Sequence, residues 1–346
     1  MWSSDHAKAY ESWMGGIEGR QVPYDDPTGR TSSVKIPTQL ENLKFFLSYQ
    51  LNFLYWRYFM WNFAGRQKDI QSMGEKDHGN WITGISFIDN ARLGDQSLLP
   101  DSLKENKGHN VFYCRPLLLG LIGLFFQAYK GKRGIRQFWV VFFLFFMTGI
   151  AIVIYLNQTP TQPRERDYSY AGSFYAFAIW IGFGVLGIIS GLEKLLKNRK
   201  VATIISTAAC LLVPVLMAAQ GWEGHNRAGK TSALDWGKNY LTQLPENAVS
   251  VTRGDNDTFP LWYVQEVEGY RTDVRVCNYM LSSGYWYVHQ MGRKIYDSER
   301  LPLTLTPDQY NNGVNEQVYI QDVIDGPVEL IDAIEFVKSD NPRTKA

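Results

Sequence analysis

The sequence predicts an α-helical polytopic membrane protein with about four transmembrane helices and a C-terminal extramembrane α/β domain. The middle of the chain, residues 111–220, holds apolar stretches of about 20 residues, enough to cross roughly 30 Å of hydrocarbon as helices. Basic turns separate these stretches, and polar segments flank them on both sides. The chain also carries 20 Tyr and 11 Trp, and both side chains collect at membrane interfaces.

Four spans are expected within this middle region. They are residues 111–129, 137–156, 171–192 and 201–220. The third contains Gly182, Gly184 and Gly187, which predicts close packing against a neighbouring helix, because small residues let helix backbones approach in lipid. The alternative, buried helices of a soluble protein, fits poorly with a charge-free second stretch that follows a basic turn.

The distribution of charge predicts how the chain threads the membrane. Residues 130–136 and 193–200 each carry four Lys or Arg, whereas the two arginines of loop 157–170 are offset by two acids. Since basic flanking residues stay on the cytoplasmic side, loop 157–170 and both large polar segments should face outward. The net charge of +1 gives no reason to expect a nucleic-acid partner, which would favour a basic face.

The first segment, residues 1–110, is aromatic-rich and expected at the outer face. Within it, residues 45–64 carry one charge, Arg57, among many Tyr and Trp. This pattern predicts an interfacial helix lying on the membrane, with a fifth span as the alternative. A long polar outer segment with no apolar leader predicts further spans upstream, so the chain resembles an internal piece of a longer protein.

The last segment, residues 221–346, is expected to be a mixed α/β domain on the outer face. Strands at 248–251 and 274–277, with a helix at 259–268 between them, indicate a parallel crossover unit. Helices at 285–296 and 327–337 and a further strand at 317–320 complete the prediction.

Two loops are candidate sites. In the first, Arg164 and Arg166 suit a lipid-linked phosphate, because a guanidinium binds phosphate oxygens bidentately. The alternative is a self-paired charge cluster that anchors the helix ends at the headgroups.

The second candidate is a ligand loop formed by Asp255, Asn256 and Asp257 after a strand, where open α/β sheets bind ligands. Its paired Asp oxygens suit a hard cation, but Asp257 or Thr258 could equally cap the next helix. The five His stand at no metal-ligand spacing, so no metal centre is predicted and no cofactor is certain.

Seven strings of residues are long enough to be specific. They are Tyr49–Phe53, Tyr55–Gln67, Gly108–Tyr113, Tyr155–Pro160, Pro163–Tyr168, Tyr170–Phe177 and Gly254–Tyr263. With these strings the chain resembles bacterial polytopic membrane proteins of a protein O-mannosyltransferase-like family, long grouped as a domain of unknown function and related to a eukaryotic transmembrane protein O-mannosyltransferase.

The resemblance implies a GT-C-type glycosyltransferase of the bacterial inner membrane, with large segments facing the periplasm. It also implies a polyprenyl-phosphate sugar as donor and an exported protein as acceptor, modified at Ser or Thr. A catalytic carboxylate is then expected in an early outer loop, upstream of Met1. Enzymatic activity of this chain therefore stays open, and the alternative is a non-catalytic envelope protein whose outer domain binds a partner.

The resemblance also implies roles for the first loop. Arg164 and Arg166 would steady the departing phosphate, Glu165 or Asp167 would orient them, and Tyr168 would stack on sugar or lipid.

Overall fold

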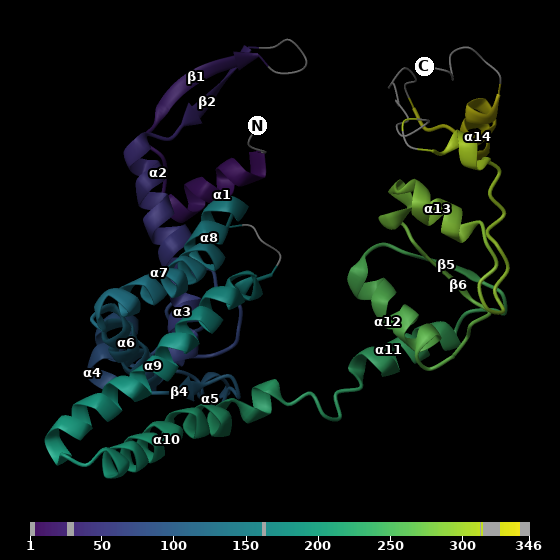
Figure 1. Cartoon of the computed structure of the whole chain (residues 1–346). Helices are drawn as coiled ribbons and strands as arrows, with labels where there is room; N and C mark the ends of the chain where they lie inside the picture. Colours follow the sequence, from purple (N-terminus) through teal and green to yellow (C-terminus); the bar gives the residue numbers. More distant parts are fainter. Residues whose placement is uncertain (1–3, 26–30, 161–163, 312, 314–325, 340–346) are drawn as a thin grey trace. The chain divides into compact units, whose positions relative to one another are not determined.

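The computed structural model describes residues 4–25, 31–160, 164–311, 313 and 326–339. The chain divides into an N-terminal unit, Met1–Asn226, and a C-terminal unit, Arg227–Ala346. The N-terminal unit is mostly helical, whereas the C-terminal unit combines helices with a two-stranded sheet (Figure 1), and each is described by itself.

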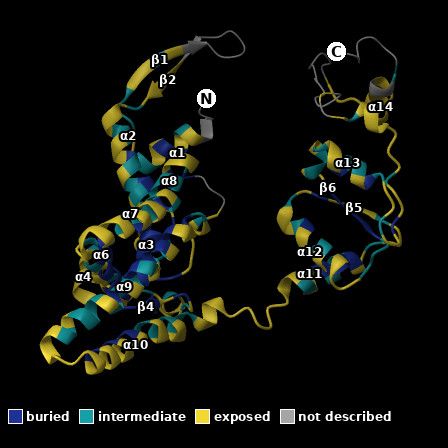
Figure 2. Cartoon of the chain, in the orientation of Figure 1, coloured by how far each residue is buried: buried dark blue, intermediate teal, exposed yellow. Residues whose placement is uncertain are grey.

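Three helical stretches of the N-terminal unit are long and apolar enough to cross a membrane. They are Gly131–Leu156 (α7, Gly131–Thr148, with α8, Ile150–Leu156), Asp167–Leu196 (η3, Asp167–Tyr170, with α9, Ala171–Leu196) and Arg199–His225 (α10). Their mean hydropathies are 2.5, 1.9 and 2.3. Only 11% of the apolar window of α10 is buried, and Figure 2 shows that much of this helix is exposed.

The first predicted span is shorter than expected. It forms α6, Arg115–Ala128, a helix of 14 residues that is about 21 Å long at 1.5 Å per residue. Tyr113 and Cys114 both adopt φ of 54°, a left-handed conformation that interrupts a helix. Pro116 then stands in the first helical turn, so the residues before it form a strand and a turn instead.

Glycines bring α6 and α9 into backbone contact. A Cβ at Gly123 would collide with the carbonyl of Trp180, and one at Gly184 with the carbonyl of Leu119. Gly187 lies against Ile122, whereas a Cβ at Gly182 would meet nothing within 4 Å. Close packing is therefore confirmed at two of the three predicted glycines.

The order of these contacts fixes the direction of the helices. Gly120 lies against Phe177, and Gly187 against Phe126, so α6 and α9 run parallel and the basic residues that follow them lie at the same end of the unit. At the opposite end, the side chain of Gln220 in α10 hydrogen-bonds both backbone groups of Val111, at 2.6 and 3.0 Å. Basic turns at one end and loop 157–170 at the other are what the predicted threading requires.

Residues 39–63 form one continuous helix: α2 (Gln39–Phe45), the π-helical η1 (Phe46–Trp56) and α3 (Arg57–Phe63). The rings of Tyr55, Phe59 and Phe63 meet those of Phe145, Phe174 and Phe177 at centroid distances from 4.6 to 6.4 Å. The aromatic residues that predicted an interfacial position thus largely make internal contacts, and the interfacial position stays a prediction.

The remaining elements of the N-terminal unit are short. They are α1 (Ser4–Met14), β1 (Arg20–Asp25), β2 (Thr31–Ile36), β3 (Gly65–Arg66), α4 (Ser86–Leu93), η2 (Gln96–Leu98), α5 (Asp101–Lys104) and β4 (Asn110–Val111). The pairs β1–β2 and β3–β4 are antiparallel. The second pair joins residues that are 44 and 46 positions apart. The hydrogen bonds between Gln220 and Val111 hold β4 beside the end of α10.

The C-terminal unit contains the predicted parallel crossover. Its elements are α11 (Ser232–Thr242), β5 (Val249–Thr252), α12 (Asp255–Glu266), β6 (Arg275–Asn278), η4 (Leu281–Ser283), α13 (Tyr285–Met291), η5 (Pro307–Gln309) and α14 (Leu330–Lys338). Strands β5 and β6 pair in parallel, which confirms the strand–helix–strand prediction. The core between α11, α12 and β6 consists of Leu241, Leu261, Val264, Val274 and Val276.

Helix boundaries differ from the prediction in three places. Helix α12 begins four residues earlier than expected, α13 ends at Met291 before Gly292, and α14 begins at Leu330. The strand predicted at 317–320 lies outside the described residues.

Replacing Gly123 with Ala should destabilise the N-terminal unit by about 1–3 kcal/mol, the usual cost of overpacking, because the colliding atom is a backbone carbonyl that cannot rotate away. The matched control is Gly182→Ala, whose Cβ would meet open space. Thermal unfolding in lipid nanodiscs should show a lower midpoint for Gly123→Ala and an unchanged midpoint for Gly182→Ala. Equal midpoints for the two variants would contradict the close approach of α6 and α9.

Candidate functional site

The loop between α8 and α9 is fixed to the helix of residues 39–63. Helix α8 ends at Asn157, which adopts φ of 42°, and the side chain of Gln50 donates a hydrogen bond of 2.6 Å to its Oδ1. Gln50 is buried, so this contact anchors the beginning of the loop from inside the unit.

A second and stronger anchor is an ion pair between Arg57 and Glu165. The distance from Arg57 Nη2 to Glu165 Oε1 is 2.9 Å, and the two side chains are 5% and 19% exposed. Arg57 also donates to the carbonyls of Phe53 and Gly79, at 3.1 and 2.9 Å, and Glu165 accepts from the amide of Ser72 at 3.1 Å. This arrangement satisfies both charges and positions the loop.

Glu165 therefore pairs with Arg57 rather than with the arginines on either side of it. Sequence reasoning missed this partner, although the signal was present: Arg57 is the single charge in an aromatic stretch. A lone charge among apolar residues needs a partner, and Glu165 and Asp167 were acids in a loop predicted to lie at the same face of the membrane.

The two arginines predicted to bind phosphate have different surroundings. Arg164 is exposed, and its guanidinium carbon lies 5.9 Å from the ring centroid of Tyr168. Arg166 is half-buried, and its Nε has no hydrogen-bond partner in the described part of the chain. Neither arginine forms an ion pair with a described residue, so a phosphate-binding role for them stays a prediction.

Asp167 lines a cavity of about 400 Å³ at this end of the unit. The cavity lies between α3, β3, β4, η3 and the end of α10. Its lining residues are Trp61, Asn62, Arg66, Asn110, Phe112, Asp167, Met217, Ala218, Gly221, Trp222 and His225. Three of them carry or can carry a charge, Arg66, Asp167 and His225, and sequence reasoning singled out only Asp167.

Arg66 and Asp167 face this cavity without forming an ion pair. Arg66 Nε donates to the carbonyl of Gly108 at 2.8 Å, and its guanidinium lies 5.6 Å from the centroid of Trp61. Burial lowers the pKa of Arg66, while the charges of Asp69 and Asp167 act in the opposite direction. Arg66 and Asp167 form no ion pair within 4 Å among the described residues, so neither charge neutralises the other directly.

Two lining residues carry buried polar atoms that no described residue satisfies, Nε1 of Trp61 and Oδ1 of Asn110. Such atoms normally find a partner. Around the same cavity, His225 Nδ1 lies 2.8 Å from the carbonyl of Gly221, which leaves its other ring nitrogen for a ligand. One cavity is thus lined by a cation (Arg66), a carboxylate (Asp167), a neutral donor (Trp61 Nε1) and a neutral acceptor (Asn110 Oδ1).

The second predicted loop has a mainly structural role at Asp257. Its carboxylate accepts hydrogen bonds of 2.8 Å from the amides of Arg253 and Gly254, and these bonds lower its pKa. Asp257 thus caps α12, the alternative that the sequence left open. Asp255 and Asn256 are exposed, and no group of three His, Cys, Asp or Glu side chains among the described residues could hold a metal ion.

The described parts of the chain thus contain three helices long and apolar enough to span a membrane and a C-terminal unit with a two-stranded parallel sheet. Residues 233–346 match the family model described as TMEM260-associated domain 2. No curated protein and no solved structure matches the chain significantly. The match lies within the C-terminal unit, so the cavity around Arg66 and Asp167 lies outside it.

Breaking the Arg57–Glu165 pair should destabilise the N-terminal unit. Glu165→Gln leaves a buried guanidinium without its countercharge, and such a loss typically costs about 3 kcal/mol. The matched control is Glu223→Gln, because Glu223 pairs with Lys107 where both side chains are well exposed and such pairs contribute about 0–1 kcal/mol. Denaturation in nanodiscs should show a larger loss in the free energy of unfolding for Glu165→Gln than for Glu223→Gln. Similar losses in the two variants would contradict a buried ion pair at Arg57 and Glu165.

Removing the Asp257 cap should destabilise the C-terminal unit by about 1 kcal/mol at neutral pH. The folded pKa is lowered, so the contribution of Asp257 is complete above the ordinary value of 3.8 and is lost as the pH falls through the folded pKa. Asp257→Ala should therefore differ from wild type at pH 7 and converge with it in acid. Asn256→Ala is the control, and equal unfolding midpoints of the two variants at pH 7 would argue against the cap.

Proposed function

We propose that the chain is part of a membrane glycosyltransferase at the periplasmic face of a bacterial inner membrane. It would transfer a mannose-like sugar from a polyprenyl-phosphate donor to Ser or Thr of an exported protein. The observation that carries the proposal is the cavity that Arg66 and Asp167 both line, with no ion pair between them among the described residues.

The donor has three chemically distinct parts, and the surroundings of the cavity offer a partner for each. A guanidinium with free nitrogens suits a phosphate, so Arg66 would bind the donor phosphate and disperse the charge that develops as the sugar leaves. Asp167 would accept hydrogen bonds from sugar hydroxyls, and the rings of Trp61 and Trp222 would pack against the sugar. The apolar helices α9 and α10 would keep the polyprenyl chain in lipid.

Arg164 and Arg166 would assist from the same loop, because they flank Glu165 and Arg166 directly precedes Asp167 in the chain. The base that deprotonates the acceptor hydroxyl is assigned to no residue of this chain. The resemblance of seven strings to O-mannosyltransferase-like proteins supports the proposal, as does the match of residues 233–346 to a TMEM260-associated domain.

A second candidate function is that of a non-catalytic envelope protein. It is favoured by the Arg57–Glu165 pair, which gives one of the loop charges a structural role.

Substitutions in the cavity should separate the two functions. In a strain that lacks the gene, complementation with Arg66→Ala or Asp167→Asn should lower glycosylation of exported proteins by about 100-fold. Each variant removes a charge that the donor needs in the transition state, worth about 2.7 kcal/mol for that factor. Mass spectrometry of Ser- and Thr-linked hexose provides the measurement, with protein levels in the membrane checked in parallel.

The control is Arg20→Ala, an exposed arginine of β1 that should leave glycosylation unchanged. Normal glycosylation in both cavity variants would exclude the cavity as the donor site. Normal glycosylation in the strain without the gene would favour the envelope protein.

A further inference from the structure

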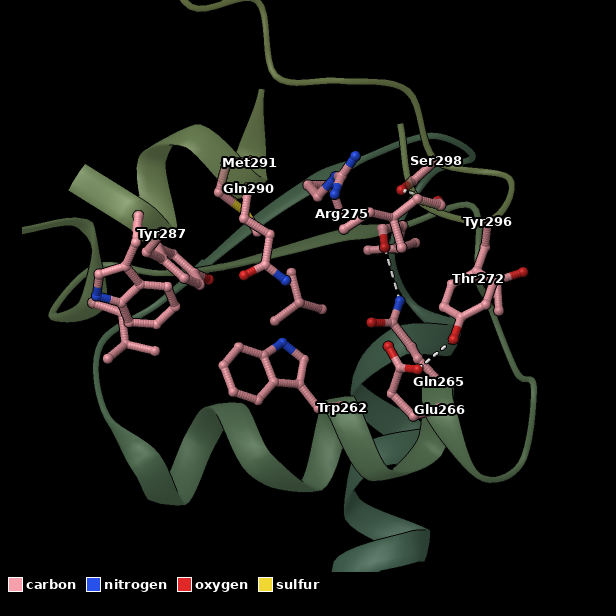
Figure 3. Close-up of a pocket in the computed structure, with 15 residues that line it drawn as sticks. Trp262, Gln265, Glu266, Thr272, Arg275, Tyr287, Gln290, Met291, Tyr296 and Ser298 are labelled. Atoms are coloured by element: carbon pink, nitrogen blue, oxygen red, sulfur yellow. Dashed lines mark hydrogen bonds between the residues drawn. The ribbon is translucent and has the colours of Figure 1, made fainter. Parts of the chain in front are cut away.

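The C-terminal unit contains its own cavity, of about 330 Å³. It lies between α12, α13 and β6 (Figure 3), with Trp262 and Gln265 on one helix and Gln290 on the other. Val274 and Val276 of the strand segment provide apolar walls. Nothing described above assigns a role to this cavity.

Internal hydrogen bonds hold the walls of this cavity in place. Gln265 Nε2 donates to the carbonyls of Arg271 and Val274, both at 2.8 Å. The hydroxyl of the buried Tyr287 accepts a hydrogen bond of 2.7 Å from the amide of Asn278. A site whose side chains are fixed in this way loses little entropy when a ligand binds.

Other polar groups of the cavity have no structural role. The indole nitrogen of Trp262 and the side-chain amide of Gln290 make no hydrogen bond with any described residue, and in Figure 3 the two side chains face each other across the cavity. The hydroxyl of Tyr296 donates to one oxygen of Glu266, which leaves the second oxygen of this carboxylate available. These groups can bind a ligand without breaking existing contacts.

The charges of the cavity argue against an anionic ligand. Its one cation, Arg275, is 4% exposed and donates through Nη2 to the carbonyls of Arg293 and Glu299. Glu266 is negative and would repel a phosphate. A purely apolar ligand would offer no hydrogen-bond partner to the amide of Gln290 or the carboxylate of Glu266, both of which belong to exposed residues.

We propose that this cavity binds a saccharide. A pyranose ring has an apolar face of C–H groups that packs on an indole, here Trp262, and a rim of hydroxyls. These hydroxyls can pair with an amide, which both donates and accepts, and with a carboxylate, which accepts, here Gln290 and Glu266. The proposal uses only the C-terminal unit and does not depend on the function proposed for the other cavity.

The test measures binding of methyl α-mannopyranoside, methyl α-glucopyranoside and methyl β-galactopyranoside to the full chain. The chain is held in lipid nanodiscs, because glycoside detergents would compete. Saturation-transfer NMR should detect at least one of the three with millimolar affinity. Trp262→Ala and Gln290→Ala should each weaken that binding at least 10-fold.

Two controls locate the binding. Trp236→Ala removes an exposed indole of the same unit that lies outside the cavity, and Arg20→Ala changes an exposed arginine of the other unit; both should bind as wild type does. Absence of binding to all three glycosides, or full affinity in Trp262→Ala, would overturn the proposal. Binding of an unglycosylated Ser/Thr peptide that requires Trp262, without glycoside binding, would assign the cavity to polypeptide instead.

Discussion

A charge inside an aromatic bundle needs a countercharge, and this requirement organises the end of the N-terminal unit that holds loop 157–170. Arg57 is buried among Phe53, Tyr58 and Trp61, with its guanidinium 3.9 to 5.1 Å from their ring centroids. Its partner Glu165 comes from a loop more than one hundred residues later in the chain. A buried ion pair is costly to break, so Glu165 stays beside Arg57. Asp167, two residues later, begins η3 and lines the cavity.

The helices behind that loop are arranged by a different interaction, the backbone contact of α6 with α9. Without a hydrophobic driving force between helices in lipid, close packing of small residues supplies much of the association. Gly123 and Gly184 allow that approach, and the parallel direction it enforces places both sets of basic residues at one end. The charge pattern predicts that both basic segments lie at one end of the helices, and the packing of α6 against α9 places them there.

Local patterns predicted well wherever a short stretch of sequence decides the structure. The parallel strands around α12 follow from two short stretches with apolar residues that flank a helical one, and the long apolar helices follow from hydropathy. The first span was predicted too long because the left-handed turn at Tyr113 and Cys114 leaves no signal in hydropathy. The start of α12 was predicted late because its composition resembles a turn, although Asp257 caps a helix there.

The candidate site was only partly predictable, because its residues meet through long-range pairing. Arg66 lines the cavity because β3 pairs with β4. His225 lines it because Gln220, in the same helix α10, hydrogen-bonds Val111 of β4. Asp167 alone stood in a segment whose local composition marked it. The same pairing explains why the cavity combines unlike groups: separate elements bring a cation, a carboxylate and an imidazole into one space, and no local charge pair neutralises them. Opposite charges kept apart in this way are suited to a ligand that carries both a phosphate and hydroxyls.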